Sequence, residues 1–230
     1  MTEWMRKLAA ELFGAFVLVF AGTGAIVTNE MSGGTVSHIG IALTFGLVVL
    51  SMIYALGDVS GCHLNPAVSI GFFVARRFDG RMVIPYMISQ CSGAILASFT
   101  LCLLFPTSTT LGATTPAGSA LQSFVVEFLL TLILMFVILS VSTGSKEKGM
   151  MAGVAIGSVI ALEALFAGPI SGASMNPARS LAPALVSMNF TNLSIYIFAP
   201  ILGACASVFV CRCVQEPGCC CRETTKESRS

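Results

Sequence analysis

The clearest shortage in this sequence is charge. Only 10% of its 230 residues are Asp, Glu, Lys or Arg, whereas soluble domains carry about 25%. Hydrophobic residues make up 55% of the chain, and its mean hydropathy is +0.89. These values exclude an ordinary soluble domain and predict a polytopic protein of the lipid bilayer. The net charge of +1 gives no support to a nucleic-acid partner, and we expect none.

The side chains that most enzymes and metal sites use are also scarce. The chain has two histidines, His38 and His63, and its apolar segments contain no nucleophile–base set and no metal-ligand spacing. We therefore expect neither an enzyme nor a cofactor or metal. Five of the nine cysteines lie in or beside the polar C-terminal segment, at Cys211, Cys213, Cys219, Cys220 and Cys221. Acylation, metal coordination and no role all remain open for them, and adjacent cysteines beside a membrane suit acylation better than zinc.

Six apolar runs are long enough to cross a bilayer, which takes about 17–25 residues. They cover residues 8–28, 39–57, 82–105, 121–142, 151–168 and 194–211. Two more apolar segments, 66–76 and 177–187, would each span only about 16 Å of the ~30 Å hydrocarbon core. The sequence therefore predicts an all-α membrane protein with six transmembrane helices and two re-entrant half-helices.

A ten-residue pattern, S-G-x-x-x-N-P-A-x-S, occurs twice in the chain. It begins at Ser60 and again at Ser171, 111 residues later, and Glu11 and Glu127 lie in matching apolar runs. Such spacing indicates internal duplication and, with the half-helices, an inverted repeat. We expect one domain over residues 1–230, built of two repeats at about 5–105 and 121–213 and followed by a Cys-rich polar tail at 214–230.

Each predicted half-helix begins at an Asn-Pro-Ala tripeptide, at residues 65–67 (Asn65, Pro66, Ala67) and 176–178 (Asn176, Pro177, Ala178). Asn is a good N-cap, and Pro is well tolerated at the first helical position. The glycine-bearing segment before each cap cannot be helical throughout, so its backbone must be buried in protein or line water. We expect its carbonyls to form a row of acceptors along a pore, at Gly61, Cys62, His63, Gly172 and Ser174.

Lys and Arg are missing from three segments, 29–37, 106–120 and 187–193. Eleven of the twelve basic residues fall on the opposite side of the predicted topology, which the positive-inside rule assigns to the cytoplasm together with both termini. The twelfth, Arg179, lies within the membrane, where a charge marks a functional site facing water. The alternative is an arginine neutralised by a buried carboxylate, for which Glu163 is the nearest candidate.

Two Asn-Pro-Ala half-helices, an arginine after the second and six spans in inverted repeat make the chain resemble the aquaporin (major intrinsic protein) family over about residues 5–213. The run from Ala167 to Leu181 looks most like the nodulin-26-like branch. The resemblance implies a homotetramer with a pore in each subunit, in a cell membrane that we expect to be the plasma membrane. It also implies that Glu11 and Glu127 hold the re-entrant loops.

The resemblance implies a passive channel for water. Asn65 and Asn176 would donate hydrogen bonds to a passing water and so interrupt the proton wire. The two half-helix N-termini, each with about half a positive charge, oppose a cation by about 4 kcal/mol at ~4 Å and an effective dielectric of ~20. A secondary transporter with broken helices and a structural membrane protein are the rival interpretations, and the intact asparagine pair argues against both.

The resemblance also places a selectivity filter at four positions: Phe45, Ala164, Ala173 and Arg179. Strict water channels have His at the position of Ala164, so a wider filter is expected here, passing glycerol and neutral metalloid hydroxides such as boric or arsenous acid. A strictly water-selective pore is the alternative. Aquaglyceroporins usually carry Asp where Ser180 stands, so the chain departs from that branch.

Two further polar residues lie within the predicted membrane segments. For Glu163 we expect pairing with protein N–H groups away from the lumen rather than a carboxylate at the filter. For His63 we expect a neutral, hydrogen-bonded ring that supports the first loop rather than a pH sensor. Asn189 and Asn192 begin glycosylation sequons close to the last span, so we doubt their use.

Overall fold

The computed structural model describes residues 1–142 and 150–215, and this part of the chain is helical without strands. Six of its helices are long and apolar enough to span a membrane: α1 (Glu3–Met31), α2 (Ser37–Ser60), α4 (Gly80–Leu104), α5 (Ala120–Val141), α7 (Ala152–Ser171) and α9 (Leu193–Val214). Two short helices, α3 (Pro66–Val74) and α8 (Pro177–Val186), complete the set. The predicted fold of six spanning helices and two half-helices is confirmed.

The helix ends depart from the predicted apolar runs by a few residues. α1 begins at Glu3 rather than near residue 8, because the Thr2 hydroxyl caps it by accepting from the Met5 amide. α4 begins after Asp79, whose carboxylate caps the Arg81 amide, and hydrogen bonding from the Arg81 side chain lowers the pKa of that carboxyl. α3 ends at Val74 instead of 76. Apolar runs mark the segment in hydrocarbon, whereas caps decide where a helix begins.

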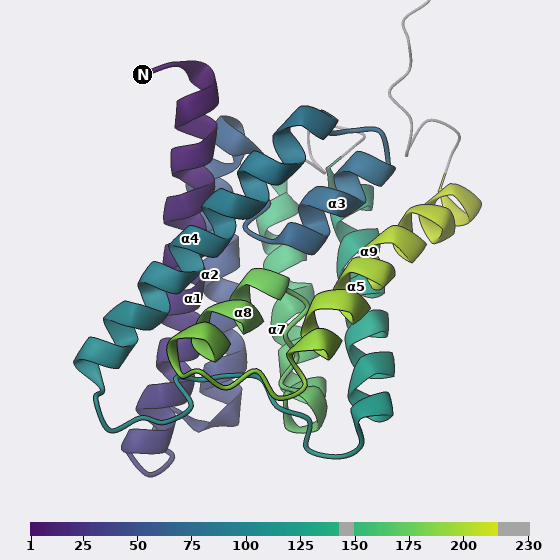
Figure 1. Ribbon diagram of the computed structural model, residues 1–230. Coiled ribbons are helices and arrows are strands. Elements are labelled where there is room, and N and C mark those ends of the chain that lie inside the picture. Colours follow the sequence, from purple (N-terminus) through teal and green to yellow (C-terminus); the bar gives the residue numbers. More distant parts are fainter. Residues whose placement is uncertain (143–149, 216–230) are drawn as a thin grey trace, which may run out of the picture.

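The packing repeats itself in the two halves of the chain. α1 lies along α4, and α5 lies along α9 in the same way, while α2 of the first repeat packs against α7 of the second. Each half-helix also packs against the last long helix of the other repeat, α3 against α9 and α8 against α4. In Figure 1, α3 lies in the upper half of the molecule and α8 in the lower half. This exchange ties the two repeats into one unit.

Two glycines allow the closest helix contacts, again once in each repeat. A Cβ on Gly93 of α4 would overlap the Leu12 carbonyl oxygen of α1. A Cβ on Gly203 of α9 would overlap the Phe128 carbonyl oxygen of α5 in the same way. Because the opposing atoms are backbone, the helices would have to separate to admit a side chain. Small residues at helix crossings in membranes serve this close approach.

We expect Gly93→Ala and Gly203→Ala each to lower the free energy of unfolding by about 1–3 kcal/mol, the usual cost of overpacking. The matched control is Gly57→Ala in α2, where a Cβ would meet nothing within 4 Å and the added methyl favours the helix. Thermal unfolding of the purified protein in detergent checks this. Equal melting temperatures for the three variants would contradict the proposed role of the crossings.

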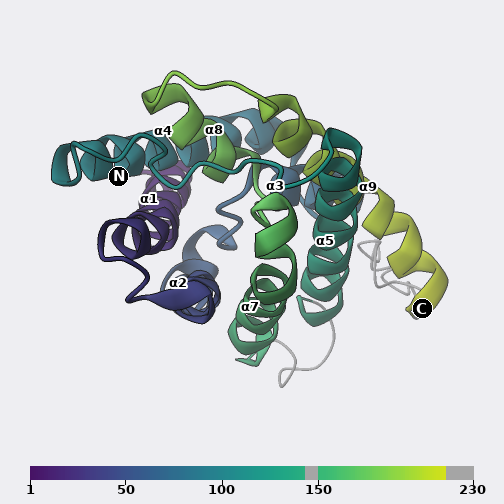
Figure 2. The same cartoon turned by 90° about the horizontal axis from the view of Figure 1, so that it is seen from below.

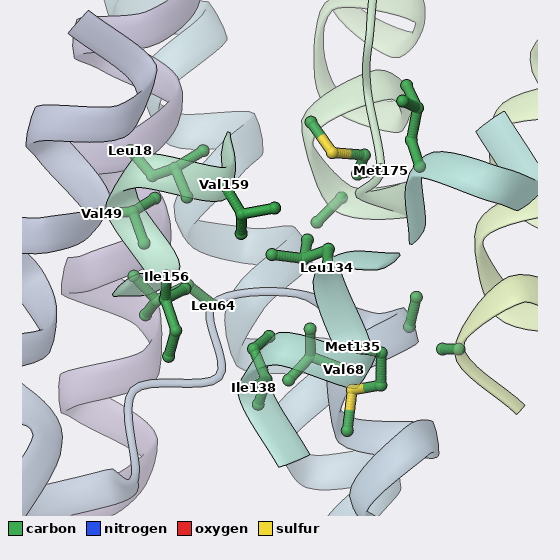
Figure 3. Packing of buried hydrophobic residues seen from close by; sticks show 14 of the residues in the cluster. Leu18, Val49, Leu64, Val68, Leu134, Met135, Ile138, Ile156, Val159 and Met175 are labelled. Carbon is green, nitrogen blue, oxygen red and sulfur yellow. The ribbon is translucent and has the colours of Figure 1, made fainter. Parts of the chain in front are cut away.

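The main apolar cluster includes residues of both re-entrant segments. Figure 3 shows Leu18 of α1, Val49 of α2 and Ile156 of α7 converging near Leu64, with Leu134 of α5 on the other side. Leu64 is 2% exposed. A non-helical segment is thus held deep inside the helix bundle, as an irregular backbone in a membrane requires.

Candidate functional site

The two half-helices begin as their sequences predict. Asn65 has an extended backbone, and its Oδ1 accepts from the Ala67 amide at 2.9 Å. Asn176 matches it, with Oδ1 accepting from Ala178 at 3.0 Å and from Arg179 at 3.4 Å. Proline occupies the first turn of both helices. The side-chain oxygen of each asparagine is therefore fixed toward its own half-helix, and the side-chain nitrogen points the other way.

Each asparagine nitrogen donates to the re-entrant loop of the other repeat. Asn65 Nδ2 donates to the Met175 carbonyl at 2.8 Å, and Asn176 Nδ2 donates to the Leu64 carbonyl at 2.9 Å. These reciprocal bonds join the tips of α3 and α8. An amide nitrogen carries two hydrogens, so each asparagine keeps one N–H beyond this bond, and both residues border the central cavity.

The loops before the caps share an unusual backbone. Three of their residues have positive φ in each repeat: Gly61 (82°), Cys62 (51°) and Leu64 (51°), and Gly172 (89°), Ala173 (43°) and Met175 (54°). Residues with a Cβ pay about 1–2 kcal/mol each for this conformation. Such strain persists only where surrounding contacts impose it.

Two fully buried carboxylates supply those contacts. Glu127 accepts from the Ser171 hydroxyl at 2.8 Å and from the Ser174 and Met175 amides at 2.9 and 2.8 Å. Glu11 accepts in the same way from Ser60, His63 and Leu64, at 2.7, 2.9 and 2.7 Å. Both glutamates therefore lie against the loops, where the resemblance places them.

Three further contacts that hold the loops were not predicted from the sequence. Gln90 Nε2 donates to Glu11 at 2.8 Å, and among the described residues no side-chain amide donates to Glu127. The hydroxyls of Tyr86 and Tyr196 donate to the Ser60 and Ser171 carbonyls at 2.8 and 2.7 Å. The two tyrosines are 110 residues apart, so repeat spacing could have found them, whereas nothing in the sequence marks Gln90.

A cavity of about 850 Å³ runs through the bundle past both asparagines. All four predicted filter positions border it: Phe45, Ala164, Ala173 and Arg179. It is also bordered by Asp58 near the end of α2, by Ser142 after α5 and by Ala152 at the start of α7. The cavity passes Gly61, Cys62, His63 and Ser174 but not Gly172, which instead caps α7 and lies against Thr114. The prediction that Gly172 lines the pore is wrong.

Arg179 is held by the 105–119 connection and by an aromatic ring. Its side chain is buried, Nη1 donates to the Gly112 carbonyl at 2.8 Å, and the guanidinium lies over the Phe45 ring, 5.3 Å from its centroid. The Phe45 ring in turn lies where a Cβ on Gly22 would be. Within residues 1–142 and 150–215 Arg179 makes no ion pair. Neutralisation by Glu163 is thus wrong, and Gly112 is a partner that the sequence did not indicate.

The comparisons with known proteins agree with this geometry. The family described as Major intrinsic protein (MIP) matches residues 1–211. This chain belongs to the major intrinsic protein family. Among relatives, Aquaporin NIP1-1 of Oryza sativa subsp. japonica is 44% identical over 97% of this chain and 79% of its own length. Aquaporin NIP1-2 of Arabidopsis thaliana is 44% identical with the same two coverages. The resemblance to the nodulin-26-like branch is therefore confirmed.

A solved structure shares the fold. The aquaglyceroporin from Plasmodium falciparum superposes with a TM-score of 0.78 at 27% identity, over 90% of this chain and 94% of that one. Membership of the family, together with six apolar helices of spanning length, makes this chain a multi-pass membrane protein.

The hydrogen bonding of Glu163 differs from what the sequence predicted. The residue is fully buried and does not border the cavity, as expected, but neither carboxyl oxygen has a hydrogen-bond partner within the described residues. The predicted pairing with protein N–H groups is wrong, because the backbone amides around it are already used within α7 and the loop amides are taken by Glu127.

His63 supports the first loop, as expected. Its Nδ1 lies 3.0 Å from the Ser69 hydroxyl, and its ring packs on Phe72, Phe78 and Tyr86 at centroid distances of 4.7, 4.7 and 5.2 Å. Four aromatic rings therefore fill the space behind this loop.

The predicted tail features are placed only in part. Cys219, Cys220 and Cys221 lie outside the described residues, while Cys213 is exposed near the end of α9. In the part of the chain that the structure describes, no group of three or more His, Cys, Asp or Glu is arranged to hold a metal ion.

Proposed function

We propose that this major intrinsic protein conducts water and small uncharged solutes such as glycerol through the described cavity, passively and in both directions. The observation that carries the proposal is the asparagine pair. Asn65 and Asn176 cap two half-helices whose N-termini meet at the cavity wall, and each keeps one N–H for a passing oxygen. Water and polyols offer such an oxygen, and no energy source is needed.

Exclusion of ions follows from the same arrangement. Two helix N-termini and the Arg179 guanidinium place positive charge along the path. A water molecule held by both asparagines points its hydrogens away from them, so proton hopping in one direction is interrupted. The backbone carbonyls between the filter and the asparagines provide acceptors for those hydrogens.

The solute range depends on four residues, and we assign the filter to Phe45, Ala164, Ala173 and Arg179. The two alanines contribute methyl groups, Phe45 contributes an aromatic ring, and Arg179 contributes a cation with several hydrogen-bond donors. This combination suits a polyol, whose hydroxyls face Arg179 and whose carbon backbone lies against Phe45. The same chemistry fits neutral metalloid hydroxides, which resemble a small polyol in shape and hydrogen bonding. The Plasmodium falciparum protein is described as an aquaglyceroporin, which is consistent with passage of water and glycerol, and the two relatives are described as aquaporins.

We further propose a homotetramer in the plasma membrane, with each subunit forming one two-repeat channel domain and with both termini in the cytoplasm. The orientation rests on the distribution of Lys and Arg, which are missing from residues 29–37, 106–120 and 187–193. The oligomer rests on the family, whose resemblance to this chain covers both repeats. Cross-linking in native membranes tests the tetramer.

Stopped-flow light scattering on proteoliposomes tests the function. An impermeant osmolyte and glycerol are applied in parallel. Fast shrinkage followed by fast re-swelling in glycerol is the expected result, and metalloid hydroxides come next. Fast shrinkage with slow re-swelling would show a strictly water-selective pore, and no acceleration over empty liposomes would contradict a channel.

Ala164→His is expected to reduce glycerol permeability by about tenfold or more while reducing water permeability much less. The imidazole adds bulk and a hydrogen-bonding group where the Ala164 methyl group borders the cavity, and water is small enough to pass beside it. Ala164→Ser is the control, because a hydroxyl adds polarity with little bulk. The glycerol-to-water permeability ratio in proteoliposomes checks both. Equal loss of the two permeabilities, or a gain in glycerol flux, would contradict the placement of Ala164 in the filter.

A further inference from the structure

Pro169 creates a gap in the hydrogen bonding of α7. It lies inside this helix, and a helical carbonyl normally accepts from the amide four residues later. Proline has no N–H, so the carbonyl of Leu165 loses its partner within the helix. Leu165 directly follows Ala164, whose methyl group borders the cavity. The unpaired carbonyl therefore lies one residue from the proposed filter.

His38 of α2 fills this gap. Its Nε2 lies 2.6 Å from the Leu165 carbonyl oxygen. A carbonyl can only accept, so Nε2 must carry the hydrogen and donate. The ring fits because residue 168 is glycine: a Cβ on Gly168 would come within 2.8 Å of His38 Cε1.

The start of α2 is itself anchored, so the backbone at His38 is held in place. The Ser37 amide donates to Asn29 Oδ1 at 2.8 Å, and the Ser37 hydroxyl accepts from the Gly40 amide at 3.3 Å. These bonds hold the first turn of α2 on both sides of His38. The backbone that carries His38 is thus held by bonds that do not involve α7.

The first repeat provides an internal comparison. The residues 111 positions before Leu165, Gly168 and Pro169 are Tyr54, Gly57 and Asp58. Asp58 keeps its N–H, so the Tyr54 carbonyl needs no donor from another helix. The space around Gly57 is open, with nothing within 4 Å of a Cβ. A histidine ring of α2 therefore packs beside the glycine and proline of α7, whereas nothing lies within 4 Å of a Cβ at the matching glycine of α2, where the proline is also missing.

We propose that His38 is a positioning residue for the pore wall at Ala164. Alanine has only a methyl group, so the width of the pore at this wall depends on where the α7 backbone lies. That backbone lacks an internal hydrogen bond at the next residue, and the bond from His38 holds it against α2. The inference rests on the proposed filter role of Ala164.

A cycle of variants tests the proposal: His38→Phe, His38→Gln, Pro169→Ala and the His38→Phe, Pro169→Ala double variant. Phe keeps the ring without the donor, Gln keeps a donor, and Ala at 169 returns the missing N–H to α7. The readout is the glycerol-to-water permeability ratio in proteoliposomes. A variant that merely folds less well lowers both permeabilities together, so the ratio moves only if the wall moves.

We expect His38→Phe to change this ratio by about threefold or more, since small changes in a pocket wall alter discrimination between solutes strongly. His38→Gln is expected to keep the wild-type ratio, and Pro169→Ala is expected to restore it in the double variant. An unchanged ratio in His38→Phe would overturn the proposal. A double variant as altered as His38→Phe would also overturn it.

The same cycle can be followed by thermal unfolding in native membranes, which needs no conduction. There the drop in melting temperature caused by His38→Phe has to be smaller in the Pro169→Ala background than in the wild type, and equal drops would overturn the pairing of His38 with Leu165. If Ala164→His leaves the ratio unchanged while the thermal cycle shows coupling, the filter assignment fails and the hydrogen bond stands. The two failures are therefore distinguishable.

Discussion

Replacing Glu127 by alanine is expected to abolish conduction and to leave little folded protein. The substitution removes the acceptor for the Ser171 hydroxyl and for the Ser174 and Met175 amides, all within a buried loop. Each buried donor left without a partner costs about 1–3 kcal/mol, so the three together cost about 3–9 kcal/mol. A typical domain is stable by only about 5–15 kcal/mol in total. Yield after detergent extraction, melting temperature and osmotic water permeability measure the effect.

Two further variants serve as comparisons for Glu127→Ala. Glu127→Gln keeps one carbonyl oxygen but turns an amide NH₂ toward backbone donors, so we expect partial loss. Glu163→Gln is the matched control, because Glu163 is equally buried but its carboxyl oxygens bind nothing within the described residues. It should retain its stability and conduction. If Glu127→Ala conducts like the wild type, the carboxylate does not hold the loop.

Arg179→Val is expected to let protons and cations leak through the pore. A unit charge about 4 Å from the path, at an effective dielectric of about 20, opposes a cation by about 4 kcal/mol. Removing it corresponds to about a thousandfold in the rate of cation passage, since 1.36 kcal/mol is a factor of ten. The substitution also leaves the Gly112 carbonyl and the Phe45 ring without their partner. A pH-sensitive dye inside proteoliposomes, with an imposed voltage, measures the leak.

Arg179→Lys separates charge from geometry. Lysine keeps the positive charge but not the planar group that lies over Phe45. We therefore expect this variant to remain tight to ions while its glycerol-to-water ratio changes. If proteoliposomes with the Arg179→Val variant leak neither protons nor cations, the half-helix N-termini alone exclude ions. The role assigned to the arginine would then be wrong.

The sequence alone determined much of this protein because the deciding interactions are local or repeated. Hydropathy over windows of about 20 residues depends only on neighbouring side chains, and it placed the six spans. Asn-Pro-Ala sets a helix start through bonds that reach two or three residues along the chain, as at Asn65 and Ala67. The 111-residue repeat and the distribution of Lys and Arg then indicated the inverted topology. The helix ends were less predictable, because caps such as Thr2 act outside the apolar runs.

Only the tertiary structure decided which distant atoms meet. Asn65 bonds to the Met175 carbonyl, Arg179 to the Gly112 carbonyl and His38 to the Leu165 carbonyl. Backbone carbonyls are the same at every residue, so no sequence pattern marks one of them as a partner. That Glu163 has no hydrogen-bond partner among residues 1–142 and 150–215 could not be read from the sequence for the same reason. Which carbonyl is close enough depends on how helices 60 or more residues apart pack together, and that packing exists only in the folded chain.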